Sequence, residues 1–188
     1  MDALLFALIG ALLGTIGDKS QHLVLAFANR FDRNGLLIAA ILLAAAFNSG
    51  ISAIAGAFIG PMLSSDARLL FLALSLLFLG VGMIWRTSPP DPLTRWRIGA
   101  FATSFVGLFI LLFGDGQQFL ILGLATRTGD PVLVAIGGTL GIAAGLVPVV
   151  IGRDAFLATL PLTLIRRVAG CVMLLVGAVC ALSAVGIA

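Results

Sequence analysis

The chain has 188 residues, of which 61% are apolar and only 10% are charged, and its formal net charge is +3. Soluble domains carry about 25% charged residues, so this composition excludes an ordinary soluble domain and predicts an integral membrane protein. The basic residues are scattered between apolar runs, which argues against nucleic-acid binding.

Six apolar runs follow one another along the chain, each close to the length of about 20 residues that a transmembrane helix needs. They cover about residues 3–29, 35–60, 67–85, 98–126, 131–151 and 163–187. Three prolines between residues 87 and 92 prevent a helix there and predict a linker at about 87–94. We expect a short interfacial turn near 154–161.

Ladders of small residues predict close helix packing, at Gly10/Gly14, Ser52/Gly56/Gly60 and Gly137/Gly141/Gly145.

Polar clusters interrupt the first and the fourth run in the middle. The first cluster, at residues 15–22, holds the only lysine and the only histidine of the chain, and the second lies at residues 114–118. A charge at bilayer depth costs several kcal/mol, so an ionisable cluster there indicates a function. In each cluster a glycine precedes an aspartate. Glycine lets a helix loosen, and free backbone at that depth is tolerated where it lines a cavity.

The two clusters belong to an internal repeat with a shift of 97 residues. Residues 17–30 and 114–127 share seven identities, and the Gly-Asp, Gln and Arg matches are the informative ones. We therefore expect a duplicated three-span unit, with repeat one at about 1–86 and repeat two at about 95–188. Because three is odd, the second copy enters the membrane inverted. The predicted fold is an all-α integral membrane domain over 1–188, with six transmembrane helices as two inverted three-helix repeats. Secondary transporters of this kind bind substrate near the midplane.

The arginines predict the orientation. If both termini face outside, the cytoplasmic loops hold eight arginines: Arg30, Arg33, Arg86, Arg95, Arg97, Arg153, Arg166 and Arg167. The outer loops then hold only Arg68 and Arg127. The positive-inside rule therefore favours a bacterial inner-membrane protein with both termini outside.

The clusters also supply a candidate cation site. Carboxylate, amide and hydroxyl oxygens suit hard cations, and two such faces would meet across the pseudo-two-fold axis. The candidate metal ligands are Asp18 and Asp115. The other candidate binding or coupling residues are Lys19, Ser20, Gln21 and Gln118, and the candidate cavity-lining residues are Thr15, His22, Asn48, Ser49 and Gln117.

Structural interpretations of the same residues stay open. Asp18 and Lys19 would then form a neutral ion pair that fixes helix packing. Asn48 and Ser49 would make hydrogen bonds within or between helices. His22 could relay protons near neutral pH.

The paired Gly-Asp clusters within three-plus-three spans resemble the GDT1/TMEM165 family. The resemblance implies a cation–proton exchanger for manganese or calcium, in which each half carries Glu-x-Gly-Asp-Lys-Ser/Thr and the acids bind the metal. Here Thr15 stands in place of the first glutamate, and Leu112 in place of the second. What carries over is Asp18, Lys19 and Ser20 in one half and Asp115 in the other. Gln21 and Gln118 fit the glutamine that follows the family signature.

These departures change the expected charge of the site. Two full signatures supply a formal −2, whereas Asp18, Asp115 and Lys19 supply −1. We expect weaker binding of a divalent ion, a different ion, or a site in which Lys19 loses its proton. In the last case Lys19 would couple the two fluxes, protonated when the site is empty and displaced when a cation arrives.

The sequence thus favours a cation/proton antiporter that exports a divalent metal such as Mn²⁺ or Ca²⁺. Its partners would be membrane lipids, the transported cation and protons, with oligomerisation left open and no nucleic acid or cofactor expected. No nucleophile–base pattern and no phosphate-binding glycine loop is recognisable, so we expect no enzyme. The alternatives are a non-transporting membrane scaffold or partner subunit, and a transporter of a monovalent ion or small organic solute.

Overall fold

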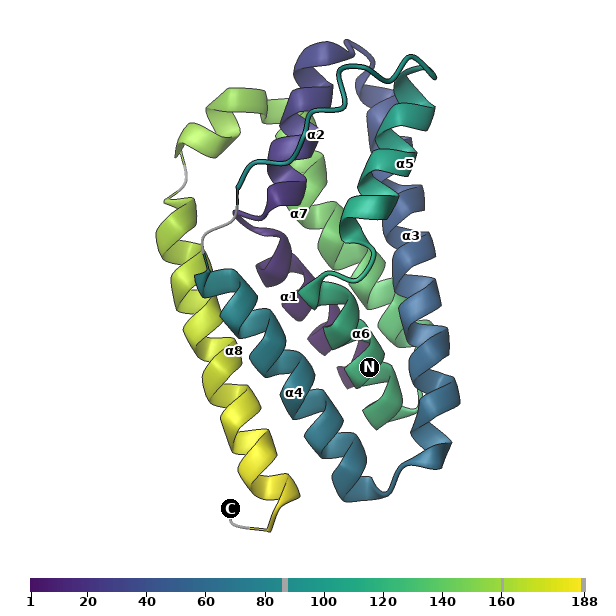
Figure 1. Cartoon of the computed structure of the whole chain (residues 1–188), viewed down its shortest axis with the longest axis vertical. Coiled ribbons are helices and arrows are strands. Elements are labelled where there is room, and N and C mark those ends of the chain that lie inside the picture. Colours follow the sequence, from purple (N-terminus) through teal and green to yellow (C-terminus); the bar gives the residue numbers. More distant parts are fainter. Residues whose placement is uncertain (86–87, 160, 187–188) are drawn as a thin grey trace.

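The computed structural model describes residues 1–85, 88–159 and 161–186, and over these residues it consists of helices and connecting turns without a strand (Figure 1). The helices are α1 Asp2–Thr15, α2 Lys19–Arg30, α3 Asn34–Ile59, α4 Ser65–Ile84, α5 Ala100–Leu112, α6 Gly116–Thr128, α7 Pro131–Thr159 and α8 Leu162–Ala184, with a short 3-10 turn at Gly60–Met62. Arg86 and Thr87, which end the expected first repeat and begin the expected linker, lie outside the described residues, as does the end of the sixth run at residue 187.

The helices match the predicted apolar runs. In the described part, α3, α4, α7 and α8 are each long and apolar enough to cross a membrane. The first and fourth runs are bent pairs, with 68° between α1 and α2 and 66° between α5 and α6. The chain is therefore a multi-pass membrane protein with four to six candidate spans, and both predicted interruptions are confirmed.

A tight turn breaks the first run. Ile16 has φ −65° and ψ 123°, and Gly17 has φ +69°. The backbone N–H of Asp18 donates to the carbonyl of Thr15 at 3.2 Å. These values define a type II β-turn, whose third position needs a positive φ and so favours glycine. The aspartate that follows the turn is the N-cap of α2.

The same turn breaks the fourth run. Phe113 has φ −67° and ψ 122°, and Gly114 has φ +75°. The N–H of Asp115 donates to the carbonyl of Leu112 at 3.2 Å, and Asp115 is the N-cap of α6. In both halves, therefore, the Gly-Asp pair has two local functions: the glycine permits the turn and the aspartate begins the next half-helix.

The segment near 154–161, expected as a short turn, is instead helical as far as Thr159. The helix α7 changes direction at Arg153, which has φ 48° and ψ −136°. The Arg153 guanidinium donates to Asp32 at 2.7 Å, and Asn29 donates to Asp154 at 3.3 Å. These contacts hold the last part of α7 against the end of α2, and a helix can run on because the next helix-breaking residue is Pro161.

Small residues bring the helix backbones close together, as the ladders predict. A methyl group added at Gly137 or Gly141 of α7 would collide with the backbone of α1, and one added at Gly56 of α3 would collide with α6. The helix α1 packs along α7, and α5 packs along α3 in the same way. Two further pairs, α3 with α7 and α4 with α8, lie along one another.

One contact between helices has no counterpart at the position that the internal repeat relates to it. The helix α6 packs tightly on α4, where added methyl groups at Gly116 and Gly123 would press on Leu79 and Ser75. Across the described residues, α2 makes no comparable contact with α8. The seam between α4 and α6 is therefore closed, whereas the region between α2 and α8 is open.

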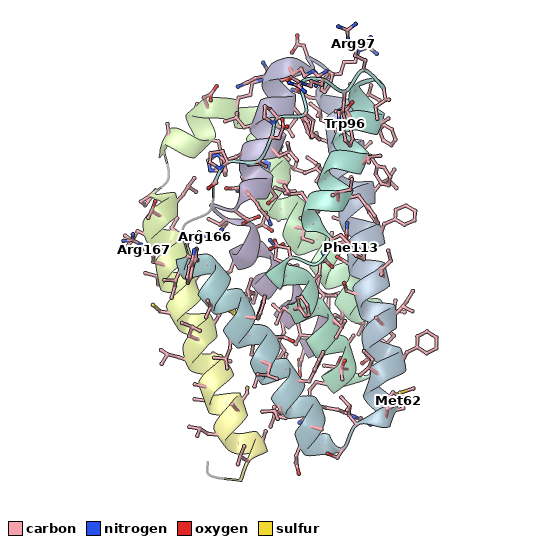
Figure 2. The ribbon with its side chains drawn as sticks, in the orientation of Figure 1. Met62, Trp96, Arg97, Phe113, Arg166 and Arg167 are labelled. Atoms are coloured by element: carbon pink, nitrogen blue, oxygen red, sulfur yellow. The ribbon has the colours of Figure 1, made fainter. Side chains whose placement is uncertain are left out.

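The two ends of the molecule differ in character. Figure 1 places both termini in its lower half, and Figure 2 shows Trp96 and Arg97 at the upper end. Both belong to the connection between α4 and α5, which extends the predicted linker as far as Gly99 and is called the linker from here on. Arg30 ties the linker to the end of α2 by donating to the carbonyls of Leu93 and Trp96, at 2.7 and 2.6 Å. The upper end therefore holds Arg97 of the linker, far along the long axis from the C-terminus.

Substitution of Gly114 tests the turn. Neither Gly114 nor Gly50 in the middle of α3 has any atom within 4 Å of an added methyl group, so both sites have room for alanine. Only Gly114 has a positive φ, so Gly114→Ala should lower the free energy of unfolding by about 1–2 kcal/mol. Gly50→Ala should be neutral or raise it by up to about 1 kcal/mol. Unfolding in detergent measures both, and equal effects would contradict the turn assignment.

Candidate functional site

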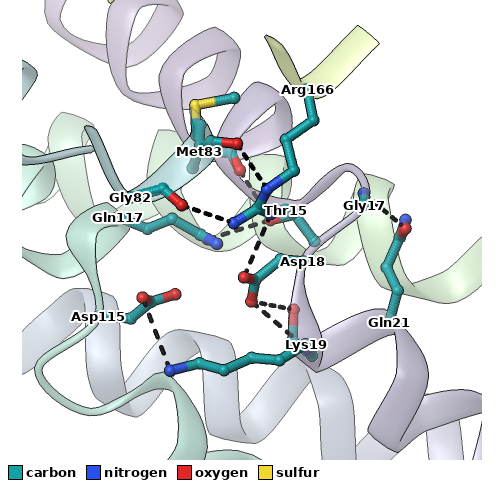
Figure 3. A network of polar contacts seen from close by, with 12 residues as sticks. Thr15, Gly17, Asp18, Lys19, Gln21, Gly82, Met83, Asp115, Gln117 and Arg166 are labelled. Carbon is teal, nitrogen blue, oxygen red and sulfur yellow. Dashed lines mark hydrogen bonds and ion pairs between the residues drawn. The ribbon is translucent and has the colours of Figure 1, made fainter. Parts of the chain in front are cut away.

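The two turns border one central cavity of about 250 Å³. Among its lining residues are Asp18, Lys19, Met83, Trp85, Asp115 and Arg166. Figure 3 shows Asp18 and Asp115 on either side of this space, each at the start of its half-helix. Two carboxylates that are 97 residues apart in the sequence thus lie on the same cavity.

Asp18 is almost fully buried, with 3% of its surface exposed. Its Oδ2 accepts hydrogen bonds from the backbone N–H of Ser20 at 3.2 Å and from the Ser20 hydroxyl at 3.1 Å. Its Oδ1 lies 3.3 Å from Nη1 of Arg166. The positive end of the α2 dipole favours the negative charge further. Both carboxylate oxygens therefore have partners within the protein.

Arg166 is the site residue that the sequence analysis missed. It was expected in a cytoplasmic loop, but it lies in α8 and is only 9% exposed. Its Nε and Nη2 donate to the carbonyls of Met83 and Gly82, both at 3.0 Å (Figure 3). These carbonyls lie in the last turn of α4, where the helix dipole favours a positive charge.

A sequence signal for Arg166 did exist. Residues 166, 170, 173 and 177 follow helical spacing, and all four are buried on the face of α8 that includes Gly170 and Gly177. A ladder of small residues predicts the packed face of a helix, so an arginine on that face is directed into the protein. Its neighbour Arg167 is exposed, and Figure 2 shows it directed away from the end of α4.

Lys19 pairs with the acid of the other half. Its Nζ lies 4.0 Å from Oδ1 of Asp115, and both side chains are partly exposed to the cavity, by 33% and 21%. The alternative Asp18–Lys19 pair is not formed, and instead there are two ion pairs, in each of which the acid meets a base from elsewhere in the fold. With Arg166 included, the site holds two acids and two bases, so its formal charge is 0 and not −1.

The glutamines and Thr15 lie behind the turns. The side-chain oxygen of Gln21 accepts from the N–H of Gly17 at 2.8 Å, and its amide donates to the carbonyl of Gly145 at 2.8 Å. The Thr15 hydroxyl lies 3.0 Å from the amide oxygen of Gln117, so the position of the missing first glutamate contacts the other half.

The second half continues this polar layer. Gln118 accepts from the hydroxyl of Ser52 at 2.9 Å. The amide nitrogens of Gln117 and Gln118 are buried and have no hydrogen-bond partner among the described residues. Leu112, at the position of the missing second glutamate, is buried and apolar. Leu112, Gln117 and Gln118 therefore lie close to the turns but do not border the central cavity.

Three other candidates lie elsewhere. Asn48 is buried in α3, and its amide donates to the carbonyls of Ala44 at 3.0 Å and Phe109 at 3.3 Å. Ser49 is buried beside the backbone of α7 at Gly138. Neither borders the central cavity.

His22 lines a second cavity of about 490 Å³, which we call the vestibule. Its lining includes His22, Met83, Trp85, Leu162, Arg166 and Arg167. It lies where α2 and α8 are not packed together. Met83, Trp85 and Arg166 border both the vestibule and the central cavity, so they separate the two.

The central cavity offers a cation two carboxylates and no third acidic, histidine or cysteine ligand, because no group of three such side chains occurs among the described residues. The oxygen chemistry of carboxylates, hydroxyls and carbonyls suits Mg²⁺, Ca²⁺ and Mn²⁺.

Comparison with known proteins bears on this arrangement. The model of the family described as "Divalent cation/proton antiporter GDT1" matches residues 3–91 and 100–187 of the chain. A relative from Vibrio cholerae serotype O1, described as "Putative manganese exporter", is 32% identical over 176 residues, which cover 93% of this chain and 88% of the relative. No solved structure matches the chain.

Proposed function

The chain belongs to the GDT1 family and is a cation transporter, and from this membership we propose that it is a cation/proton antiporter that exports a divalent cation such as Mn²⁺ or Ca²⁺ through the central cavity. One observation carries the proposal: Asp18 and Asp115, from two separate helix breaks, border the same cavity. A transporter family also fits the expectation of a protein that is not an enzyme.

The relative's name supports Mn²⁺ as the first ion to test. In the proposed site the metal ligands are Asp18 and Asp115, and Ser20 orients Asp18. Further ligands would be carbonyl oxygens or water, which both Mn²⁺ and Ca²⁺ accept. Divalent binding requires at least one of the two bases to move, because the paired acids already have cationic partners.

We further propose that the site lies at the midplane between two inverted repeats. Three features support this. The turns at Gly17 and Gly114 have matching backbone angles. The packing of α1 on α7 parallels that of α5 on α3. The family model matches the chain in two segments of similar length. Broken helices from each half are the usual source of such sites.

The asymmetry between the halves supports a direction of access. The vestibule between α2 and α8 is open, whereas the corresponding seam between α6 and α4 is closed. The vestibule adjoins the end of α4 that leads into the arginine-bearing linker. By the positive-inside rule this end faces the cytoplasm of an inner membrane, so the proposed conformation is open inward, ready to load a cation for export.

Two alternatives remain distinct. A formal charge of 0 at the site favours a monovalent ion over a divalent one, and this observation supports the transporter of a monovalent ion. A scaffold or partner subunit would keep the ion pairs as permanent structural links and move nothing.

The first test measures transport. In liposomes loaded with a pH dye, the wild-type protein should respond to Mn²⁺ or Ca²⁺, and Asp115→Asn should abolish the response because one of two carboxylate ligands is lost. Asp66→Asn, at the exposed start of α4, is the matched control and should transport normally. Silence of the wild type with every cation would favour the scaffold, and a response to Na⁺ or an amine alone would favour the other transporter.

A second test concerns Lys19 as the coupling group. Its ammonium lies 4.0 Å from Asp115 and would be displaced, with loss of its proton, when a cation enters. In Lys19→Met we expect cation movement to persist while the accompanying proton flux falls several-fold. Cation flux and the dye signal are measured in the same vesicles. Proton-coupled transport that is intact in Lys19→Met would remove this role.

A third test concerns orientation. Alkaline phosphatase is active only outside the cytoplasm, so a fusion at the C-terminus should be active and a fusion after Trp96 in the linker should be inactive. The reverse pattern would overturn the proposed inward-facing vestibule without affecting the assignment of the site.

A further inference from the structure

Arg166 occupies the boundary between the vestibule and the central cavity. It borders both spaces, together with Met83 and Trp85. A cation that entered from the vestibule would therefore pass its guanidinium before it reached the two carboxylates. Neither the family signature nor the repeat accounts for this residue, because the position 97 residues earlier is Leu69.

The contacts of Asp18 explain why this placement matters. Ser20 satisfies one carboxylate oxygen, and Nη1 of Arg166 lies 3.3 Å from the other. While the guanidinium stays there, a metal ion binds this second oxygen more weakly, because two positive charges would share one buried carboxylate oxygen. The guanidinium thus holds the place that a cargo cation would take.

We propose that Arg166 is a tethered counter-ion and gate of the transport site: it neutralises Asp18 when the site is empty and withdraws from it when the cargo cation binds. This inference rests on the proposed cation transport and adds the residue that sets affinity and release. Arg166 is a positioning residue here, since it acts through Asp18.

Two hydrogen bonds to α4 tether the guanidinium, and in the proposed gate it can leave Asp18 without losing them. Nε and Nη2 are held by the carbonyls of Met83 and Gly82 at the end of α4. In the proposed gate, a rotation about the edge that joins Nε and Nη2 takes Nη1 away from Asp18 while the group stays bonded to α4. The guanidinium then competes with the bound cation for Asp18, and its return promotes release of the cation and restores the charge balance. Loading and release then depend on competition between two cations for one carboxylate.

The test compares Arg166 with an arginine that lies away from both cavities. Arg166→Gln removes the competing charge but keeps an amide that can donate to the α4 carbonyls. We expect equilibrium Mn²⁺ binding in detergent to tighten by about tenfold or more. In liposomes the KM for Mn²⁺ should fall and the maximal rate should also fall, because release is slowed. Arg127→Gln removes the same charge from an exposed residue in the last turn of α6 that borders neither cavity, and it should leave both quantities within about twofold of wild type.

Two further measurements keep the proposal open to refutation if Arg166→Gln folds poorly. Arg166→Lys retains the charge and should keep Mn²⁺ affinity within about threefold of wild type. Trp85 borders both cavities beside Arg166, and in a Trp96→Phe protein it is the one remaining tryptophan, so the fluorescence comes from a residue at this boundary. Its emission wavelength should shift when cation binds, and binding without a shift would contradict the withdrawal of Arg166.

The outcomes separate this inference from the proposed function. Wild-type protein that neither binds nor transports any cation would overturn both. Wild-type transport together with unchanged affinity in Arg166→Gln would overturn only the role of Arg166 and leave it as a structural link between α4 and α8.

Discussion

Two carboxylates inside an apolar bundle need positive partners, and much of this structure follows from that requirement. Asp18 is 3% exposed, and water cannot solvate its charge adequately at that burial. Arg166 of α8, which is also hydrogen-bonded to α4, pairs with Asp18, and Lys19 pairs with Asp115. Each pair joins segments that are far apart in the sequence, so charge balance and helix packing depend on each other.

The Gly-Asp dipeptide explains how such a site can form at all within a membrane helix. An unbroken helix would direct its backbone groups along its own axis and offer nothing to a cavity. The type II turn, which Gly17 and Gly114 permit through positive φ, ends one half-helix and begins the next. The aspartate then lies at a helix N-terminus, where the dipole stabilises its charge. A two-residue signature thus determines both the break and the position of the acid.

The predictions from sequence succeeded where local pattern determines structure. The six apolar runs, the two interruptions and the small-residue packing faces follow from composition and spacing. The structure also places Asp18, Lys19 and Asp115 around one cavity, while their role in binding stays a prediction. The partners of the two acids could not be predicted from the sequence, because each ion pair depends on tertiary contacts. Lys19 is the base nearest to Asp18 in the sequence, yet Asp18 pairs with Arg166, which is 148 residues away. Arg166 was assigned to a loop because it was counted only as a positive charge near the end of a span. The helical extension beyond Arg153 was missed because contacts with Asp32 and Asn29 hold it in place.

The departures from symmetry are unevenly distributed, and this bears on mechanism. His22 and Arg166 border the vestibule and Lys19 borders the central cavity, while the positions related to them by the repeat shift are Phe119, Leu69 and Gly116. One access route is therefore bordered by basic side chains, and the other is closed by the close contact of α6 with α4. In a symmetric site, a cation would meet the same electrostatic barrier along both access routes. Basic side chains along the vestibule raise the electrostatic barrier to a cation that crosses it in either direction, so the barriers of the two routes differ. The direction of net transport through such a site is then set by the cation and proton gradients, because a fixed asymmetry changes the rates of entry and return alike.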